Sequence, residues 1–322
     1  MNDHKYNILV ADDIESIRTA IRDYLANDYN IFEADSGVSA LEIFKTEKID
    51  LLLTDIRMPV MGGIELIKNI HQVYPDIPCA LMTAYNVNDF IEYARNERIW
   101  NIIPKSTFLD LHFIKTMIYK LLSDDIFGIE KYFPETVKRE IKVSALHNLA
   151  ELQENIFYSI DLDGEQTADE NCELIGEMLV KNGCPTIIRQ VIDELTSNAM
   201  IHGNAYDNKN RKNKYHDPFN FSFGKLKGKF AIAVMDKKGT LDREEILLRL
   251  ERHVKIDPAT GLPLGITDSH GRGLFISREN LDHLIFNIEI NKRTEALGII
   301  SPHQAIQNRS LSVYQIPSAA VS

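Results

Sequence analysis

Five short apolar runs, each followed by an amphipathic segment, constrain the fold of the first part of this chain more than any other feature. The runs are NILV, NIFEA, DLLLT, PCALMT and WNIIP, and they lie between residues 6 and 122. They are too apolar for strands with one face in water, which indicates strands covered on both faces. We therefore predict an α/β domain with a doubly wound, five-stranded parallel sheet.

Polar residues stand at the carboxyl ends of these runs, where such a sheet binds its ligands. Asp12 and Asp13 follow the first run, Asp55 ends the third, Thr83 ends the fourth and Lys105 follows the fifth. Carboxylates that converge on one crevice repel unless they share a cation, and oxygen ligands suit Mg²⁺. A carboxylate so placed can attack a phosphoryl group, with a lysine and a hydroxyl steadying the transferred oxygens. The pattern predicts an acyl-phosphate switch.

This part of the chain, residues 1–123, resembles response-regulator receiver domains, most closely in DIRMPVMGG, which begins at Asp55. The resemblance implies that Asp55 accepts a phosphoryl group from a cognate sensor histidine kinase, and that Thr83 and Lys105 contact that group. The implied Mg²⁺ ligands are Asp12 (partly through water), Asp13, Asp55 and the backbone carbonyl of Arg57. Ile102 departs from the family, because it replaces the usual switching tyrosine or phenylalanine.

A second chemical signal lies in VIDELTSNAMIHGN, residues 191–204. Glu194, Asn198 and His202 are four residues apart, so on a helix they share one face beside an apolar stripe. A carboxamide oxygen can hold a hard cation, and a carboxylate one turn away can take a proton from a hydroxyl. The helix therefore offers a metal ligand and a base, although a solvated amphipathic helix would have the same pattern.

Two later stretches favour the chemical interpretation. Residues 229–240 read as an apolar strand that runs into Asp236 and a turn at Gly239, and residues 270–276 place Gly271 and Gly273 before a helical run. Such glycines let the backbone approach phosphates closely, and the amino end of a helix adds positive potential. An acid and an asparagine on a helix, followed by these two glycine boxes, form an ordered set typical of a nucleotide site.

In this ordered set, residues 166–317 resemble the Bergerat-fold (GHKL) ATPases, in the branch of anti-sigma-factor serine kinases. The resemblance implies an α+β sandwich in which Asn198 holds the Mg²⁺ of ATP, Glu194 deprotonates a protein serine or threonine, and Asp236 accepts the adenine amino group. Thr240 departs from relatives that carry a second glycine there. The implied nucleotide-binding set is Asn198, His202, Asp236, Gly239, Gly271, Arg272 and Gly273.

Between the two domains, residues 124–165 predict a helical connector. Gly128 and Pro134 interrupt its beginning, and an apolar seam with helical spacing then follows. The seam either docks on the ATPase domain or pairs with a second copy as a dimer helix. His147 lies in the predicted helix, but no phosphoacceptor motif surrounds it, so we interpret it as a surface histidine. The seam residues are Ile141, Ala145, Leu149, Leu152 and Ile156.

The remaining segments of residues 166–322 give simpler predictions. We expect helices near 169–181 and 241–252, a hairpin over 219–236, and closing strands at LIFNIEINK and SVYQIP. Residues 204–218 read as a long polar loop, and residues 253–270 as a mobile lid over the ATP phosphates.

Charge and hydropathy exclude several functional classes. The net charge of −11 opposes binding to nucleic acid or anionic lipid. No run approaches the ~18 apolar residues of a membrane span, and the amino terminus lacks the apolar segment of a signal peptide. Three cysteines without ligand-like spacing read as reduced thiols. We expect a soluble, cytoplasmic protein.

Together these signals predict a response regulator whose phosphorylation at Asp55 controls a Mg²⁺- and ATP-dependent serine/threonine protein kinase. By resemblance, its partners would be an anti-sigma-factor antagonist or a sigma factor. The alternative is a binding switch, gated by phosphorylation and ATP, that sequesters a partner without phosphotransfer. Glu194→Ala discriminates between the two, since only the kinase needs that carboxylate for its output.

Overall fold

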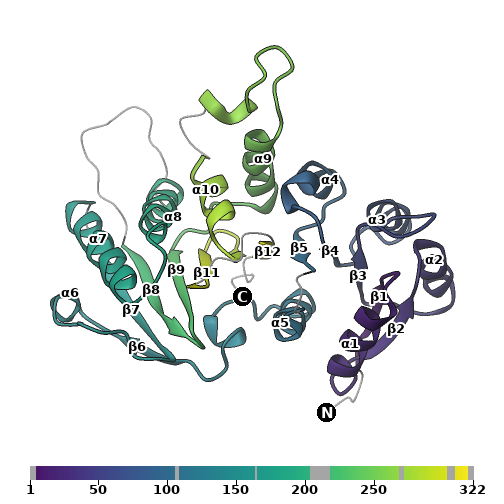
Figure 1. Cartoon of the computed structure of the whole chain (residues 1–322), viewed down its shortest axis with the longest axis horizontal. Helices are drawn as coiled ribbons and strands as arrows, with labels where there is room; N and C mark the ends of the chain where they lie inside the picture. Colours follow the sequence, from purple (N-terminus) through teal and green to yellow (C-terminus); the bar gives the residue numbers. More distant parts are fainter. Residues whose placement is uncertain are drawn as a thin grey trace. The chain divides into compact units, whose positions relative to one another are not determined.

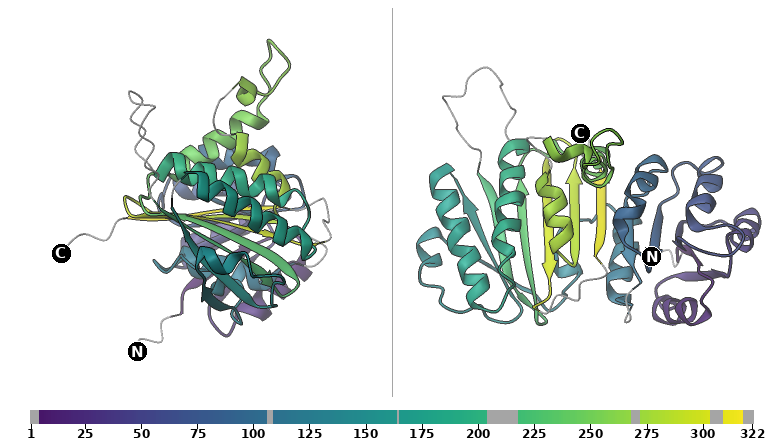
Figure 2. Two further views of the ribbon diagram at one scale, coloured as in Figure 1. Left: turned by 90° about the vertical axis from the view of Figure 1, so that its left-hand side faces the viewer. Right: turned by 45° about the horizontal axis from the view of Figure 1, so that its top comes forward.

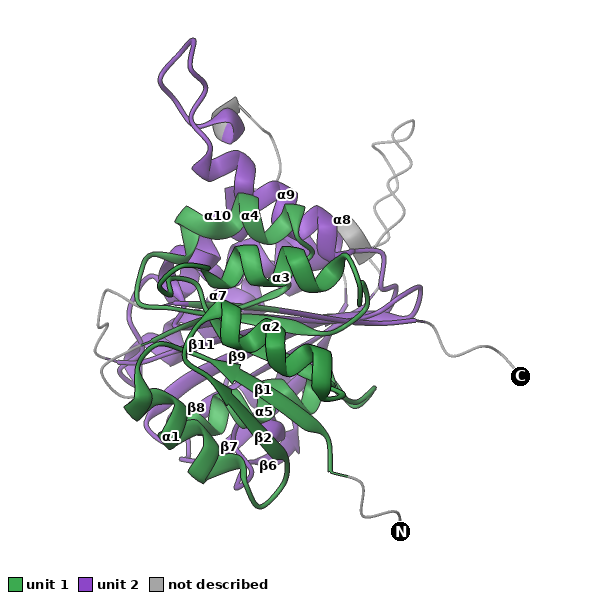
Figure 3. Ribbon diagram, turned by 90° about the vertical axis from the view of Figure 1, so that its right-hand side faces the viewer, with its two compact units in different colours: residues 1–126, 310–312 green, residues 127–309, 313–322 purple. Residues whose placement is uncertain are grey.

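The computed structural model describes residues 5–105, 109–163, 165–203, 218–267, 272–302 and 309–317. The chain divides into two compact units (Figure 3). The first contains Met1–Ile126 and Ser310–Ser312, and the second contains Phe127–Arg309 and Val313–Ser322. Among the described residues, no helix is long and apolar enough to cross a membrane.

The first unit contains the predicted five-stranded parallel sheet, in the order β2-β1-β3-β4-β5 (Figure 1). Its central strands are buried on both faces; every residue from Ile8 to Ala11, for example, is fully buried. This burial explains why the runs are apolar throughout and do not alternate with polar residues. The strands are β1 (Asn7–Ala11), β2 (Asn30–Ala34), β3 (Leu51–Asp55), β4 (Cys79–Thr83) and β5 (Asn101–Pro104).

Helices cover both faces of this sheet, as the doubly wound prediction requires. Helices α2, α3 and α4 share one core with strand residues such as Leu9, Leu52 and Leu81. Helices α3 and α4 lie on one side of the sheet and α1 on the other (Figure 3). The helices are α1 (Glu15–Leu25), α2 (Gly37–Thr46), α3 (Gly63–His71), η1 (Val87–Phe90), α4 (Ile91–Asn96) and α5 (Leu111–Leu121).

The second unit is a mixed sheet with helices on one face (Figure 2). The sheet order is β12-β10-β11-β9-β8-β7-β6; β6 and β7 pair in parallel, and the pairs β7–β8, β8–β9, β9–β11 and β11–β10 are antiparallel. The predicted hairpin over 219–236 is confirmed. The strands are β6 (Val137–Glu140), β7 (Ile156–Leu162), β8 (Phe219–Leu226), β9 (Lys229–Asp236), β10 (His283–Glu289), β11 (Arg293–Ile300) and β12 (Ser310–Ile316).

Helix α8 is the central helix of this unit and packs against both α7 and α10. The predicted helices near 169–181 and 241–252 are confirmed as α7 and α9. The helices are η2 (Ile129–Lys131), α6 (Val143–Leu146), α7 (Glu165–Lys181), α8 (Ile188–Gly203), α9 (Arg243–Val254), η3 (Leu264–Thr267) and α10 (Arg272–Asn280).

The helical connector predicted within 124–165 is wrong. Only the four residues of α6 are helical near the expected seam, and β6 and β7 lie on either side of them as strands of the second sheet. Of the predicted seam residues, Leu152 and Ile156 are buried, but in a loop and a strand, whereas Ala145 in the short helix is exposed. Apolar residues three to four apart therefore imitated a helix, and the dimer-helix interpretation loses its basis. His147 is exposed, as predicted.

Candidate functional site

Three carboxylates meet at the carboxyl edge of the first sheet. Asp12 and Asp13 follow β1 and Asp55 ends β3, and the oxygen atoms that they offer all lie within 4.8 Å of one another. Asp12 is fully buried and Asp55 is 7% exposed, whereas Asp13 is exposed to solvent. Two charges held out of water and a third at the rim favour a divalent cation with oxygen ligands.

Lys105 neutralises part of this charge. Its Nζ lies 2.7 Å from Oδ2 of Asp12 and 3.0 Å from Oδ2 of Asp55, and its side chain is only 7% exposed. The backbone N–H of Lys105 donates to the carbonyl of Thr83 at 2.6 Å, which ties the end of β5 to the end of β4. One lysine facing three carboxylates leaves a net negative crevice with a buried cation on one side.

Burial raises the pKa of the Asp55 carboxyl above its usual value, and the charge of Asp12 raises it further. The hydrogen bond and charge of Lys105 act in the opposite direction. The ionised, nucleophilic form of Asp55 is therefore held mainly by cations, since the protein around it excludes water.

The two loops beside Asp55 are held by close contacts. Gly63 begins α3 directly against the carbonyl of Asp55 and leaves no room for a Cβ. On the other side, the buried Thr83 hydroxyl accepts a hydrogen bond from the N–H of Tyr85 at 2.9 Å. The guanidinium of Arg57 lies over the ring of Tyr85, 4.4 Å from its centroid. This contact joins the loop after Asp55 to the loop after Thr83.

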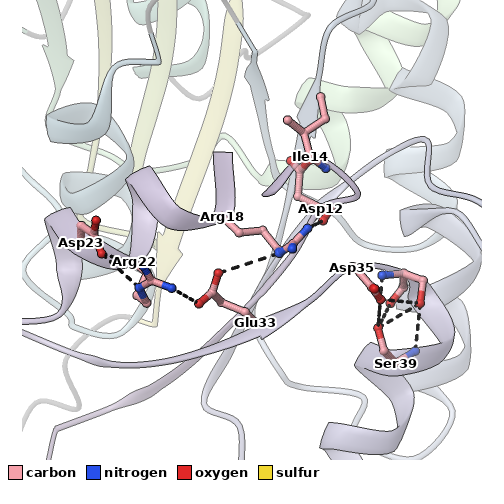
Figure 4. A network of polar contacts seen from close by, with 9 residues as sticks. Asp12, Ile14, Arg18, Arg22, Asp23, Glu33, Asp35 and Ser39 are labelled. Carbon is pink, nitrogen blue, oxygen red and sulfur yellow. Dashed lines mark hydrogen bonds and ion pairs between the residues drawn. The ribbon is translucent and has the colours of Figure 1, made fainter. Parts of the chain in front are cut away.

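Arg18 on α1 is a site residue that the sequence analysis missed (Figure 4). Its Nη1 donates to the backbone carbonyl of Asp12 at 2.6 Å, and the Oδ1 of Asp12 accepts from the N–H of Ile14 at 3.0 Å. Glu33 on β2 lies 3.8 Å from Nε of Arg18 and 2.7 Å from Nη1 of Arg22. Arginines with one-turn spacing on a first helix are the signal from which this support could have been predicted.

The comparison with family models matches residues 8–113 to the response regulator receiver domain. A relative covered over most of its length agrees: sporulation initiation phosphotransferase F of Bacillus subtilis is 35% identical over 89 residues, which is 27% of this chain and 72% of the relative. The chain belongs to the response regulator receiver family. The receiver domain occupies its first unit, and the predicted CheY-like α/β fold of that unit is confirmed.

Other relatives are similar to this chain over smaller shares of their own length. A response regulator receiver protein of Anaeromyxobacter sp. is 38% identical over 72 residues, 22% of this chain and 30% of that protein. The DNA-binding transcriptional regulator NtrC of Proteus hauseri is 33% identical over 107 residues, 33% of this chain and 23% of that protein. The chain thus spans less than a third of the length of these two relatives. A solved signal receiver domain from Pseudomonas fluorescens Pf-5 is 26% identical, with coverages of 37% and 95% and a TM-score of 0.35.

Receiver domains hold Mg²⁺ at such an acidic cluster, and the residues present fit that ion. Asp12, Asp13 and Asp55 supply hard oxygen atoms at one edge, where Mg²⁺ keeps several waters and binds few carboxylates. A Mg²⁺ ion held by these carboxylates would supply positive charge for an incoming phosphoryl group, in addition to that of Lys105. Arg57 is exposed on the loop that follows Asp55.

A second set of predicted residues converges in the other unit. Asn198 on α8 and Asp236 at the end of β9 line one pocket together with Thr294 on β11. The Nδ2 of Asn198 and the Oγ1 of Thr294 are buried and have no hydrogen-bond partner among the described residues. Unpaired buried polar atoms are costly unless a ligand or water satisfies them. The rest of the lining is Leu195, Ala199, Val234, Leu241, Phe286 and Ala296.

Asp236 shapes the turn beside this pocket. Its Oδ1 accepts from the N–H groups of Lys238 and Gly239 at 2.8 and 2.9 Å, and its side chain is buried. Gly239 has a φ of 60° and lies against the backbone of Glu289 and Arg293, so a Cβ there would clash as well as strain the chain. Thr240 directly follows this turn.

Glu194 lies outside the lining of the pocket. Its side chain packs against Gly273 in the first turn of α10, where no Cβ would fit. Burial raises the pKa of Glu194, the neighbouring Asp193 raises it further, and Arg272 acts in the opposite direction. Two predicted nucleotide residues, Gly271 and the side chain of His202, lie outside the described residues.

In this pocket Asp236 can accept hydrogen bonds, and Thr294 can both donate and accept them. The pocket volume is about 20 Å³, which is room for about one water molecule. Thr294 was not predicted, since nothing near RTEALGII marks it.

Proposed function

We propose that this protein is a response regulator in which phosphorylation of Asp55 controls an ATP-binding output domain with serine/threonine protein kinase activity of the anti-sigma type. The observation that carries the proposal is the convergence of Asn198, Asp236 and Thr294 on one pocket, with unpaired buried polar atoms. We assign the receiver to residues 1–123 and the nucleotide site to residues 166–322. Because β6 and β7 belong to the second sheet, the output domain begins before residue 166.

In the receiver, Asp55 attacks the phosphoryl group of a sensor histidine kinase. An Oδ atom of Asp55 forms the new bond to phosphorus while the bond to the donor histidine breaks. Lys105, whose Nζ lies 3.0 Å from Oδ2 of Asp55, then balances the charge of the transferred oxygens, and the buried Thr83 hydroxyl donates to one of them.

In the output domain, each proposed site residue acts through a side-chain group that the fold already holds in place. The carboxylate oxygen of Asp236 that is not bonded to the turn accepts a hydrogen bond from the adenine amino group. Asn198 holds the ATP-bound Mg²⁺ through Oδ1. Bound MgATP supplies the γ-phosphoryl group for transfer. Glu194 takes the proton of a protein serine or threonine hydroxyl, and its pKa, raised by burial and then by Asp193, makes it a stronger base than an exposed carboxylate. The proposed substrate is an anti-sigma-factor antagonist, and a sigma factor is the second proposed partner.

One observation favours a second function. Glu194 packs on α10 and lies outside the lining of the pocket, so ATP can be retained without a base in line with a substrate hydroxyl. In this alternative the output domain sequesters a partner when ATP is bound, without phosphotransfer. The two functions share Asn198 and Asp236 and differ only in the need for Glu194.

The test is the transfer of label from γ-labelled ATP with Mg²⁺ into proteins of the source organism's extract, with and without beryllofluoride on Asp55. Wild type is compared with Glu194→Ala, Asn198→Ala and the control Glu170→Ala, an exposed acid on α7. An acid-stable labelled band that needs Glu194 and Asn198 but not Glu170 supports the kinase. Calorimetric ATP binding that Asn198→Ala weakens, without any band, supports the switch. Absence of both contradicts the proposed output function.

A further inference from the structure

The segment that begins the second unit is anchored on β11. The guanidinium of Arg293 lies over the ring of Phe127, 3.8 Å from its centroid. The N–H of Gly128 donates to Oε2 of Glu295 at 3.4 Å, and Gly128 has a φ of 103°. Four residues later, Tyr132 is buried near the same carboxylate; burial first, and then Tyr314 and Glu295, raise its pKa well above the usual value. The first residues after the receiver unit therefore hold two side chains of one strand.

Those two side chains alternate along β11 with the residues that line the nucleotide pocket. Thr294 and Ala296 face the pocket, whereas Arg293 and Glu295 meet the segment after the receiver. Successive side chains of a strand point to opposite faces of the sheet, so the segment binds the back of the strand that forms the pocket wall. Asn287 on β10 completes this rear contact, since its Nδ2 donates to Oε2 of Glu295 at 2.6 Å.

The same strand also touches the glycine turn of the pocket. Thr294 pairs with Asp236 in the ladder between β11 and β9, which are neighbours in the sheet (Figure 1). The backbone of Arg293 lies against Gly239, and the N–H of Asn291 donates to the carbonyl of Gly239 at 3.0 Å. A shift of β11 would therefore move a wall of the pocket and its turn together, because packed elements shift as units.

We infer that the contact of Phe127 and Gly128 with Arg293 and Glu295 is a regulatory site that sets the width of the nucleotide pocket through β11. The inference rests on the proposed function and adds the route by which regulation arrives. It also accounts for the narrow pocket, which has room for only about one water molecule. The segment directly follows the receiver unit, so a state change in the receiver reaches it along the chain. Release of the rear contact would let β11 move, and with it the wall and the turn of the pocket.

The experiment measures the dissociation constant of a fluorescent ATP analogue with Mg²⁺, with and without beryllofluoride, on the full chain. Phe127→Leu keeps an apolar side chain but removes the aromatic face, and Glu295→Gln removes the charge from the rear contact. Arg189→Met is the matched control, since it removes an exposed ion pair with Glu177 in the same unit. Circular dichroism verifies that each variant is folded.

We expect beryllofluoride to change the wild-type affinity by about fivefold or more, a usual size for coupled sites. The ratio of the dissociation constants measured without and with beryllofluoride should fall to about one in Phe127→Leu and Glu295→Gln. It should stay at the wild-type value in Arg189→Met. If beryllofluoride changes the affinity of wild type and changes that of both rear-contact variants by the same factor, the inference is wrong and the proposed function stands. Binding without any coupling in wild type overturns it as well.

Hydrogen exchange of peptides covering β11 provides a readout that needs no nucleotide. Beryllofluoride should change the protection of these peptides in wild type and not in Phe127→Leu. If wild type binds no ATP analogue in either state, the proposed function fails, and the exchange data decide the inference alone. A change that Phe127→Leu abolishes then supports the route through β11, and no change in wild type overturns it.

Discussion

The ammonium nitrogen of Lys105 lies 3.0 Å from Oδ2 of Asp55, and both side chains are almost completely buried. The same nitrogen lies 2.7 Å from Asp12, so one cation bridges two carboxylates that water barely reaches. A single lysine at this point can stabilise the resting acid pair and also face a phosphoryl group on Asp55. The geometry leads to tests of the receiver that are independent of the output domain.

Replacing Asp55 by asparagine should abolish labelling by acetyl phosphate in the presence of Mg²⁺, because an amide cannot form the acyl phosphate. The measurement is the mass of the intact protein, in which wild type gains one phosphoryl group. Asp76→Asn, an exposed acid of the same domain, serves as the control and should be labelled normally. Full labelling of Asp55→Asn would show that another residue is the phosphorylation site.

Lys105→Met should lower the free energy of unfolding by about 3–5 kcal/mol without Mg²⁺, since it leaves Asp12 and Asp55 as unpaired buried charges. Added Mg²⁺ should restore more stability to this variant than to wild type. Urea unfolding with and without MgCl₂ measures both effects. Lys115→Met breaks an exposed pair with Asp28 and should cost less than about 1 kcal/mol. Equal losses in the two variants would contradict the assigned role of Lys105.

Asp236→Asn should weaken ATP binding by about tenfold or more, which is a loss of about 1.4 kcal/mol. Asparagine keeps an Oδ1 for the N–H groups of Lys238 and Gly239, so the turn survives, but its NH₂ group faces the adenine amino group. Calorimetry with Asp169→Asn as the exposed control checks this. An unchanged affinity in Asp236→Asn would show that the base does not bind at β9.

Glu194→Gln should stabilise the protein at pH 7 and have no effect on stability well below pH 4.5. Burial raises the pKa of Glu194 in the folded state above its unfolded value of 4.5. The ionised carboxylate therefore disfavours folding at neutral pH, and this cost disappears as the pH falls through the folded pKa and then the unfolded one. Thermal unfolding between pH 3 and 8 measures the difference, with Glu170→Gln as a flat control. A stability difference between Glu194→Gln and wild type that does not change with pH would contradict this explanation.

The receiver could be predicted because its signals are local. Each buried parallel strand is an apolar run in the sequence, and the ends of these runs meet at one edge, so Asp12, Asp55 and Lys105 followed from position alone. The one-turn spacing of Arg18 and Arg22 is visible in the sequence, but the contact of Arg18 with the Asp12 carbonyl depends on how α1 lies over the strand end.

The connector and β11 show where local signals mislead. Leu149, Leu152 and Ile156 have helical spacing, yet the pairing of β7 with β8 outweighs that preference. Arg293–Ile300 lacks a clear alternation because nearly all of β11 is buried in the middle of a sheet. A strand of this kind can be identified only from the strands that pair with it, and the order of strands in the sheet cannot be read from the sequence.

The amino-acid sequence by itself determined the receiver fold, the acidic cluster and the pairing of Asn198 with Asp236 as candidates for one site. These depend on periodicity and on the ends of strands, which are properties of short segments. Only the tertiary structure decided that Thr294 completes the pocket, that Glu194 packs on α10, and that Phe127 holds the rear of β11. The register between strands and the packing of helices decide such contacts, because they join residues far apart in the chain through geometry that no single segment contains.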